Sequence, residues 1–223
     1  MFKKGLVAGI PIFLGYLPIA IAFGLIAKTQ SVPLFATFLF SLLVFAGASQ
    51  FIALRLLGIG AGPFDIAIVT FLINLRHMLM SASLAARIEK KRWLPIISFG
   101  ITDETFSIAS TRKGPVTPSF LLGLESISYI SWVGGTLLGY LMGDFLPPGV
   151  KQSMGITLYA MFIAILIPEV KKSHAVFIVA GIGSITNVLL WLTKAVNPGI
   201  AIVISIILGA FIGAIFFDEE TIK

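Results

Sequence analysis

Long stretches of apolar residues, separated by short polar or glycine- and proline-rich stretches, run along the whole chain. The apolar runs reach 17 to 25 residues, and a helix of about 20 residues crosses the hydrocarbon core of a bilayer. The pattern therefore predicts an all-α, polytopic helical membrane protein with about seven to eight hydrophobic segments. We expect these segments at about 5–27, 33–57, 64–86, 93–110, 119–142, 153–168, 174–193 and 198–217.

The first segment contains residues that interrupt a helical hydrogen-bond ladder. Pro11, Gly15 and Pro18 lie within it, and a proline has no backbone N–H to donate. We therefore expect the first helix to be broken at these residues. A discontinuous helix can expose backbone amides and carbonyls to a substrate, whereas a simple kink is the alternative interpretation.

The fourth segment is short, has Pro95 near its start and carries Thr-Asp-Glu-Thr at its centre, so it is a candidate re-entrant segment. With eight crossings, the Lys and Arg residues of the loops, the termini and the segment ends, which are all but Arg76, divide eight against seven between the two sides of the membrane. A re-entrant fourth segment changes this division to ten against five. Because basic residues are enriched on the cytoplasmic side, the second topology places the basic cluster at 87–92 in the cytoplasm and is favoured.

The chain is expected to form a single membrane domain, 1–223, with a possible inverted repeat of two halves, 1–113 and 114–223. Each half has four apolar segments and an asparagine in its third, Asn74 and Asn187. Inverted repeats are frequent in secondary transporters.

Composition and charge support a membrane protein. Hydrophobic residues make up 57% of the chain and charged residues only 12%, whereas soluble domains carry about 25% charged residues. The net charge of +6 does not indicate nucleic-acid binding, because the Lys and Arg residues flank apolar segments, where they contact lipid headgroups. The first apolar run is too long for a signal peptide and is expected to be retained.

Ionisable residues inside apolar segments are costly and therefore point to function. Asn74, Arg76 and His77 lie near the middle of the third segment, and Asp103 and Glu104 lie in the fourth. A guanidinium fits a carboxylate and a carboxylate can hold an ammonium group, so together they can bind an amino acid at both ends. The alternative is a structural ion pair between Arg76 and Asp103 or Glu104.

Other polar residues each allow two interpretations. Ser49 and Gln50 either contact a polar group of the substrate or bond between helices. His77 either relays protons or hydrogen-bonds a neighbouring helix. Protonation removes the cost of burying a carboxylate that has no counter-ion. If Asp103 or Glu104 is such a carboxylate, we expect transport to be coupled to protons through it. For Glu125, one to two turns inside the fifth segment, we expect pairing with Lys or Arg near the membrane surface.

Common catalytic signatures are absent from the sequence: there is no phosphate-binding loop, no His-Glu-x-x-His metal motif and no nucleophile elbow. We therefore expect a transporter, with no enzymatic activity, cofactor or metal. A non-transporting scaffold or receptor subunit is the main alternative. An intramembrane enzyme using Asp103, Glu104 and His77 as acid and base is a third possibility.

Three blocks of sequence resemble the AzlC family, the large subunit of bacterial branched-chain amino acid exporters. They are Gly-Ala-Ser-Gln-Phe at 47–51, Asn-Leu-Arg-His at 74–77, and Thr-Asp-Glu at 102–104 followed by Phe106. The opening Gly-Ile-Pro at 9–11 is also similar. The resemblance covers essentially the whole chain.

The resemblance implies a permease in the cytoplasmic membrane of a prokaryote that exports hydrophobic amino acids such as valine, leucine or isoleucine. It also implies a separate small membrane subunit of the AzlD type. Glycine-rich faces, for example at Gly134, Gly135 and Gly139, are candidate surfaces for a helix of that subunit.

Overall fold

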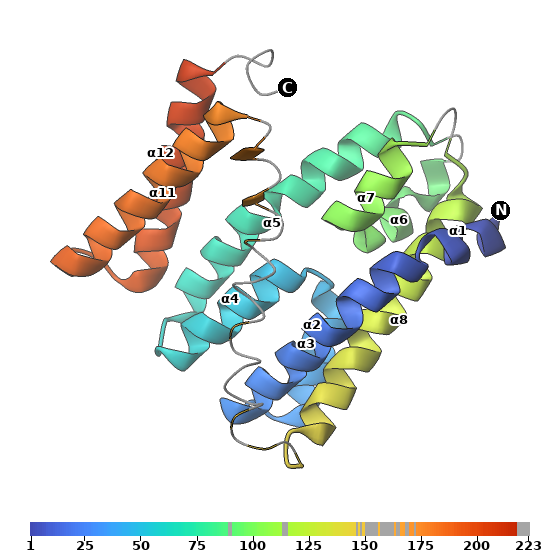
Figure 1. Cartoon of the computed structure of the whole chain (residues 1–223), viewed down its shortest axis with the longest axis horizontal. Helices are drawn as coiled ribbons and strands as arrows, with labels where there is room; N and C mark the ends of the chain where they lie inside the picture. Colours follow the sequence, from blue (N-terminus) through green and yellow to red (C-terminus); the bar gives the residue numbers. More distant parts are fainter. Residues whose placement is uncertain are drawn as a thin grey trace. The chain divides into compact units, whose positions relative to one another are not determined.

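The computed structural model describes residues 1–88, 91–112, 116–145 and 173–217, together with 147, 149, 156, 163, 166–167 and 170–171 (Figure 1). Over these residues the chain is helical, and the only described pairing of extended backbone is an isolated bridge between Ile88 and Val116. The predicted all-α fold is confirmed for this part of the chain.

Five of the described helices are long and apolar enough to cross a membrane. They are α2 (Ile10–Thr29), α5 (Pro63–Ala85), α8 (Pro118–Met142), α11 (His174–Thr193) and α12 (Pro198–Phe216). These helices correspond to the first, third, fifth, seventh and eighth predicted segments, so the chain is a polytopic helical membrane protein. The predicted sixth segment falls mainly outside the described residues.

The first predicted segment is divided near its start. The helix α1 (Phe2–Ala8) ends at Gly9, and α2 begins at the next residue. Pro11 lies in the first turn of α2. The N–H groups of the first turn have no carbonyl partner within the helix, so the N–H that a proline lacks is not needed there. The interruption therefore lies at Gly9, two residues before Pro11, and Pro11 itself is helical.

The helix α2 continues through Gly15 and Pro18, which corrects the expected break at these two positions. A proline inside a membrane helix is tolerated where neighbouring helices bond to the opened ladder. The hydroxyl of Ser131 on α8 donates to the carbonyl of Phe13 at 2.7 Å. Phe13 directly precedes the residue whose carbonyl lacks its usual donor because of Pro18.

The second predicted segment is two helices instead of one. The helix α3 (Leu34–Val44) ends at Phe45, whose backbone is left-handed with φ 36° and ψ 48°, and α4 (Gly47–Gly58) begins two residues later. Left-handed backbone is unusual for a bulky residue and stops a helix. The single segment expected at 33–57 is therefore divided at Phe45.

The fourth predicted segment is also broken, into α6 (Leu94–Gly100) and α7 (Asp103–Ser110). Thr102 caps α7: its hydroxyl accepts from the backbone N–H of Thr105, and the hydroxyl of Thr105 accepts from the backbone N–H of Thr102. At about 1.5 Å per residue, neither helix is long enough to cross a bilayer. A re-entrant segment stays a prediction that fits this geometry.

The chain forms two compact units, and each is built from separate stretches of sequence. One contains Met1–Phe51 and Asn74–Thr157, and the other contains Ile52–Ile73 and Leu158–Lys223. The units do not coincide with the halves 1–113 and 114–223, and the inverted repeat stays a prediction.

In the first unit, α1 and α2 lie along α8 (Figure 1). A Cβ at Gly24 of α2 would lie 2.8 Å from the backbone nitrogen of Tyr140, and a Cβ at Gly139 of α8 would lie 2.6 Å from the carbonyl carbon of Ile21. The two backbones therefore touch at these glycines, which is typical of helix packing in membranes. We call this contact the glycine seam.

The glycine seam corrects one sequence-based expectation. A Cβ at Gly135 would lie 2.7 Å from the Cβ of Ala20 on α2. Gly135 and Gly139 are therefore already covered by α2 and are not available to a second subunit. Only Gly134 of this group has no atom within 4 Å of a built Cβ.

We expect Gly139→Val to destabilise the protein, because the new side chain must push α2 away from α8. Overpacking of a tight core typically costs about 1–3 kcal/mol. The midpoint of thermal unfolding in detergent should therefore fall clearly. Gly134→Val is the matched control on the same helix and should unfold like the wild type; equal midpoints for all three proteins would contradict the seam.

Candidate functional site

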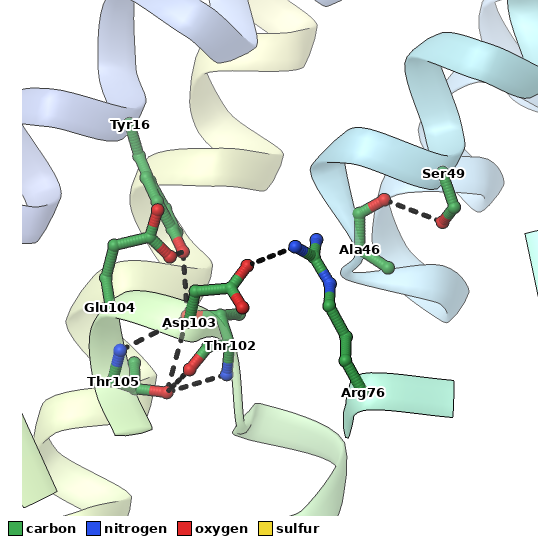
Figure 2. A network of polar contacts seen from close by, with 8 residues as sticks. All are labelled: Tyr16, Ala46, Ser49, Arg76, Thr102, Asp103, Glu104 and Thr105. Atoms are coloured by element: carbon green, nitrogen blue, oxygen red, sulfur yellow. Dashed lines mark hydrogen bonds and ion pairs between the residues drawn. The ribbon is translucent and has the colours of Figure 1, made fainter. Parts of the chain in front are cut away.

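A pair of opposite charges links α5 to the start of α7. Nη1 of Arg76 lies 2.8 Å from Oδ2 of Asp103, and the two side chains are 39% and 36% exposed (Figure 2). Asp103 is the first residue of α7, where the helix dipole favours a negative charge. The structure thus brings together two of the residues that the sequence singled out.

The guanidinium of Arg76 has a hydrogen-bond donor that this contact does not use. Its Nε is buried and has no hydrogen-bond partner in the structure. An arginine can bind a carboxylate through two parallel N–H groups, so Arg76 can accept a second carboxylate or exchange one for another. A permanent, fully bonded structural bridge would leave no such donor.

The second carboxylate of α7 has a different partner. The hydroxyl of Tyr16 on α2 donates to Oε2 of Glu104, and the hydroxyl oxygens of Tyr16 and Thr102 lie 2.7 Å apart (Figure 2). Because a phenol has a single proton, Thr102 is the donor in the second contact when Tyr16 donates to Glu104. Asp103 and Glu104 thus reach different groups, as expected for neighbouring helical residues.

Tyr16 was not among the candidate residues. It is 8% exposed, and its ring packs edge-on against Phe45 at 6.3 Å and Trp132 at 5.6 Å. A phenol deep in an apolar segment needs a polar partner. That need was a usable signal in the sequence, although the identity of the partner was not.

Asn74 lies two residues before Arg76 and contacts α4. Its side-chain nitrogen donates to the hydroxyl of Ser49 at 3.1 Å, and the same hydroxyl donates to the carbonyl of Ala46 at 2.9 Å. The side-chain oxygen Oδ1 of Asn74 is buried without a partner. It is an acceptor available to an N–H group of a ligand.

Gln50 is fully buried and holds helices together. Its side-chain oxygen accepts from the indole N–H of Trp132 at 2.9 Å and from the backbone N–H of Ala46 at 3.3 Å. Its amide nitrogen donates to the hydroxyl of Ser41 at 3.2 Å. These bonds tie the α3–α4 break to α8 and favour the interhelical interpretation of Gln50 over contact with a substrate.

His77 follows Arg76 on α5 and is half-buried. No residue that the structure describes forms a hydrogen bond with it. The structure therefore places His77 beside the ion pair without connecting it, and the proton-relay hypothesis stays a prediction.

Glu125 differs from the expectation. It is 5% exposed on α8, and no described cation lies within ion-pair distance of it. The expected pairing with Lys or Arg is therefore not found. The position of Glu125 along its apolar segment does not reveal this burial, because α6 covers the side chain.

Together these features define a multi-pass helical membrane protein with charged and polar side chains gathered where apolar helices are broken. The comparisons with known proteins agree with this class. The family described as AzlC protein matches residues 11–146. The chain belongs to the AzlC family.

Relatives with curated names cover most of the chain. A membrane protein of Archaeoglobus fulgidus is 38% identical over 183 residues, which are 81% of each chain. The inner membrane protein YgaZ of Escherichia coli is 29% identical and covers 85% of this chain and 82% of its own. The branched-chain amino acid transport protein AzlC of Bacillus subtilis is 27% identical and covers 77% of this chain and 68% of its own. No solved structure matches significantly.

Proposed function

We propose that the chain is a secondary transporter subunit that moves branched-chain or other hydrophobic amino acids across the cytoplasmic membrane. The observation that carries the proposal is the partly bonded Arg76, which contacts Asp103 through one nitrogen and keeps a buried, unbonded Nε. The printed name of the Bacillus subtilis relative supports the choice of substrate.

The geometry suits a zwitterion. The substrate carboxylate takes the free edge of Arg76 or replaces Asp103 there, and charge-assisted, paired N–H bonds favour this exchange. Asp103, once released, is a carboxylate at a helix N-terminus that can hold the substrate ammonium group. The unpartnered Oδ1 of Asn74 is a further acceptor for the same group.

Transport is expected to be directed outward, because the chain resembles an exporter family. Flux of labelled leucine, valine and a polar control, glutamine, in vesicles tests the function. We expect saturable exchange of leucine and valine and little exchange of glutamine. Vesicles that exchange no leucine above the protein-free level, with or without a partner subunit, would support the scaffold or receptor alternative.

We further propose that the working transporter contains a small membrane subunit of the AzlD type, as the resemblance implies. Co-expression with such a protein should give a complex that stays together through purification on a tag carried by this chain. Leucine exchange should rise when the complex replaces the isolated chain. Full exchange by the isolated chain would contradict this proposal.

A further inference from the structure

The described acidic residues near the proposed site differ sharply in their partners. Asp103 has Arg76 as a counter-ion, and Glu104 accepts the hydroxyl of Tyr16. A carboxylate with such a partner does not need a proton to be stable inside a membrane. These two residues therefore lack the feature on which coupling to protons was predicted.

Glu125 has this feature. The side chain lies on α8, is 5% exposed, and its Oε1 is buried without a hydrogen-bond partner. The hydroxyl of Ser128, three residues along α8, donates to the carbonyl of Leu124 instead. An ionised carboxylate without a partner is very costly in such a place, whereas a protonated carboxyl group is tolerated.

Among the residues that the structure describes, no charge on a neighbouring element compensates Glu125. The described elements that contact α8 include α1, α2, α3, α6, α7 and the start of α4, residues 47–51, which carries no titratable group. Together with α8, they carry the following other titratable residues: Lys3, Lys4, Tyr16, Lys28, Asp103, Glu104, Tyr129 and Tyr140. Arg112, just after α7, also faces α8, where its guanidinium lies 4.1 Å from the ring centre of Phe120.

None of these groups lies within hydrogen-bond or ion-pair distance of Glu125. Lys3 and Lys4 are exposed, Lys28 pairs with Asp144, and Arg112 lies over the ring of Phe120. The hydroxyls of the two tyrosines on α8 donate to the carbonyls of Leu42 and Val32. Tyr16, Asp103 and Glu104 belong to the site described above.

The carboxyl group of Glu125 occupies the space where a side chain at position 100 would lie, and it fits because residue 100 is a glycine. A Cβ at Gly100 would lie 2.5 Å from Cδ and Oε2 of Glu125, so no larger residue fits there without moving the carboxyl group. Gly100 is the last residue of α6. Its carbonyl accepts from the hydroxyl of Thr105, at 3.1 Å, in the first turn of α7.

The carboxyl group of Glu125 therefore lies against the α6–α7 break, and the far side of this break carries Asp103 and Glu104. A change of charge at Glu125 acts on Gly100, and Gly100 is bonded to the turn that positions the carboxylates of the proposed substrate site. Contact of this kind is a physical route for coupling between two sites.

We infer that Glu125 is a proton-binding site separate from the Arg76–Asp103 pair, and that substrate transport is coupled to protons through it. Only the coupling of transport to protons rests on the proposed transport function; proton binding by Glu125 does not. In the reaction the carboxyl group releases its proton to water on one side of the membrane and takes up a proton from the other side. The α6–α7 break responds to the charge that appears and disappears.

The first test does not require transport. Difference infrared spectra of the purified protein at varied pH report the C=O stretch of a protonated carboxyl group. We expect a band that is lost as the pH is raised and that is missing from Glu125→Gln, but is retained in Asp144→Asn, a control at an exposed carboxylate. A wild-type band that does not respond to pH, or one that persists in Glu125→Gln, overturns the inference.

The second test measures flux. In vesicles, wild-type leucine flux should respond to an imposed pH gradient, and Glu125→Gln should lose this response while leucine exchange stays measurable. A response that survives in Glu125→Gln overturns the coupling role. Absence of wild-type leucine exchange, both with and without the partner subunit, overturns the proposed function instead, and the infrared result still decides whether Glu125 binds protons.

If Glu125→Gln does not fold, Gly100→Ala takes its place. The added methyl group displaces the carboxyl group and should shift the pH at which the infrared band is lost. An unshifted band in folded Gly100→Ala overturns the inference.

Discussion

Arg76→Lys is expected to fold, to reach the membrane and to lose most of its leucine exchange. Lysine keeps the positive charge near Asp103 but lacks the planar fork that binds two carboxylates side by side. A charge-assisted hydrogen bond contributes about 1.5–3 kcal/mol, which corresponds to a roughly ten- to hundredfold loss of affinity or rate. Flux of labelled leucine, at matched protein levels in vesicles, measures the effect.

Arg55→Lys is the matched control, because Arg55 is an exposed arginine on α4. It should exchange leucine like the wild type. Wild-type exchange by a folded Arg76→Lys would show that only the charge at position 76 matters and would remove the basis for carboxylate binding.

The second large effect is expected from reversing the ion pair. Arg76→Asp and Asp103→Arg should each be poorly stable, because two like charges then face each other across a contact that is 2.8 Å long in the wild type. The double variant restores opposite charges and should recover much of the thermal stability. Leucine exchange should nevertheless stay absent, since the guanidinium has moved from α5 to α7.

This double variant separates the two interpretations of the pair. A purely structural bridge works in either direction, so recovery of stability and exchange together would favour a structural role. Recovery of stability alone is the result expected for a binding site. Both single variants are measured beside the double variant, because the interaction between the two positions is obtained from all four proteins together.

The long spans were predictable because hydropathy and length determine them. The predicted segment 174–193 has the bounds of α11, and the predicted segment 64–86 differs from α5 by one residue at each end. Only burial in lipid is needed to make these stretches helical, and a run of apolar residues shows this directly.

The helix break at Phe45 and the break before α7 differ in how far the sequence reveals them. The break before α7 has a local signature, because Thr102 and Thr105 form a capping box within four residues. The break at Phe45 has no Pro or Gly at its turning residue, and it is held by Gln50 together with the distant Trp132. A contact across 82 positions leaves no local pattern to detect.

The site was predictable in its residue types and only partly in its pairing. Arg76 and Asp103 stood out because charges inside apolar segments are rare, and either of two carboxylates was an acceptable partner. The assignment of Glu104 to Tyr16, and the isolation of Glu125 behind Gly100, depend on which helix faces come together. That arrangement is set by tertiary packing.

In the proposed transport cycle, the glycine seam also limits which parts of the molecule can move. Where two backbones touch, a slide of one residue, about 1.5 Å, brings a side chain into the opposing main chain. We therefore expect helices α2 and α8 to stay together as a rigid pair in that cycle. In the proposed transport cycle we expect alternation between inward and outward openings to come from segments outside this backbone contact. Helices α6 and α7 are examples, because they meet α8 and α2 through the side chains of Glu125 and Tyr16.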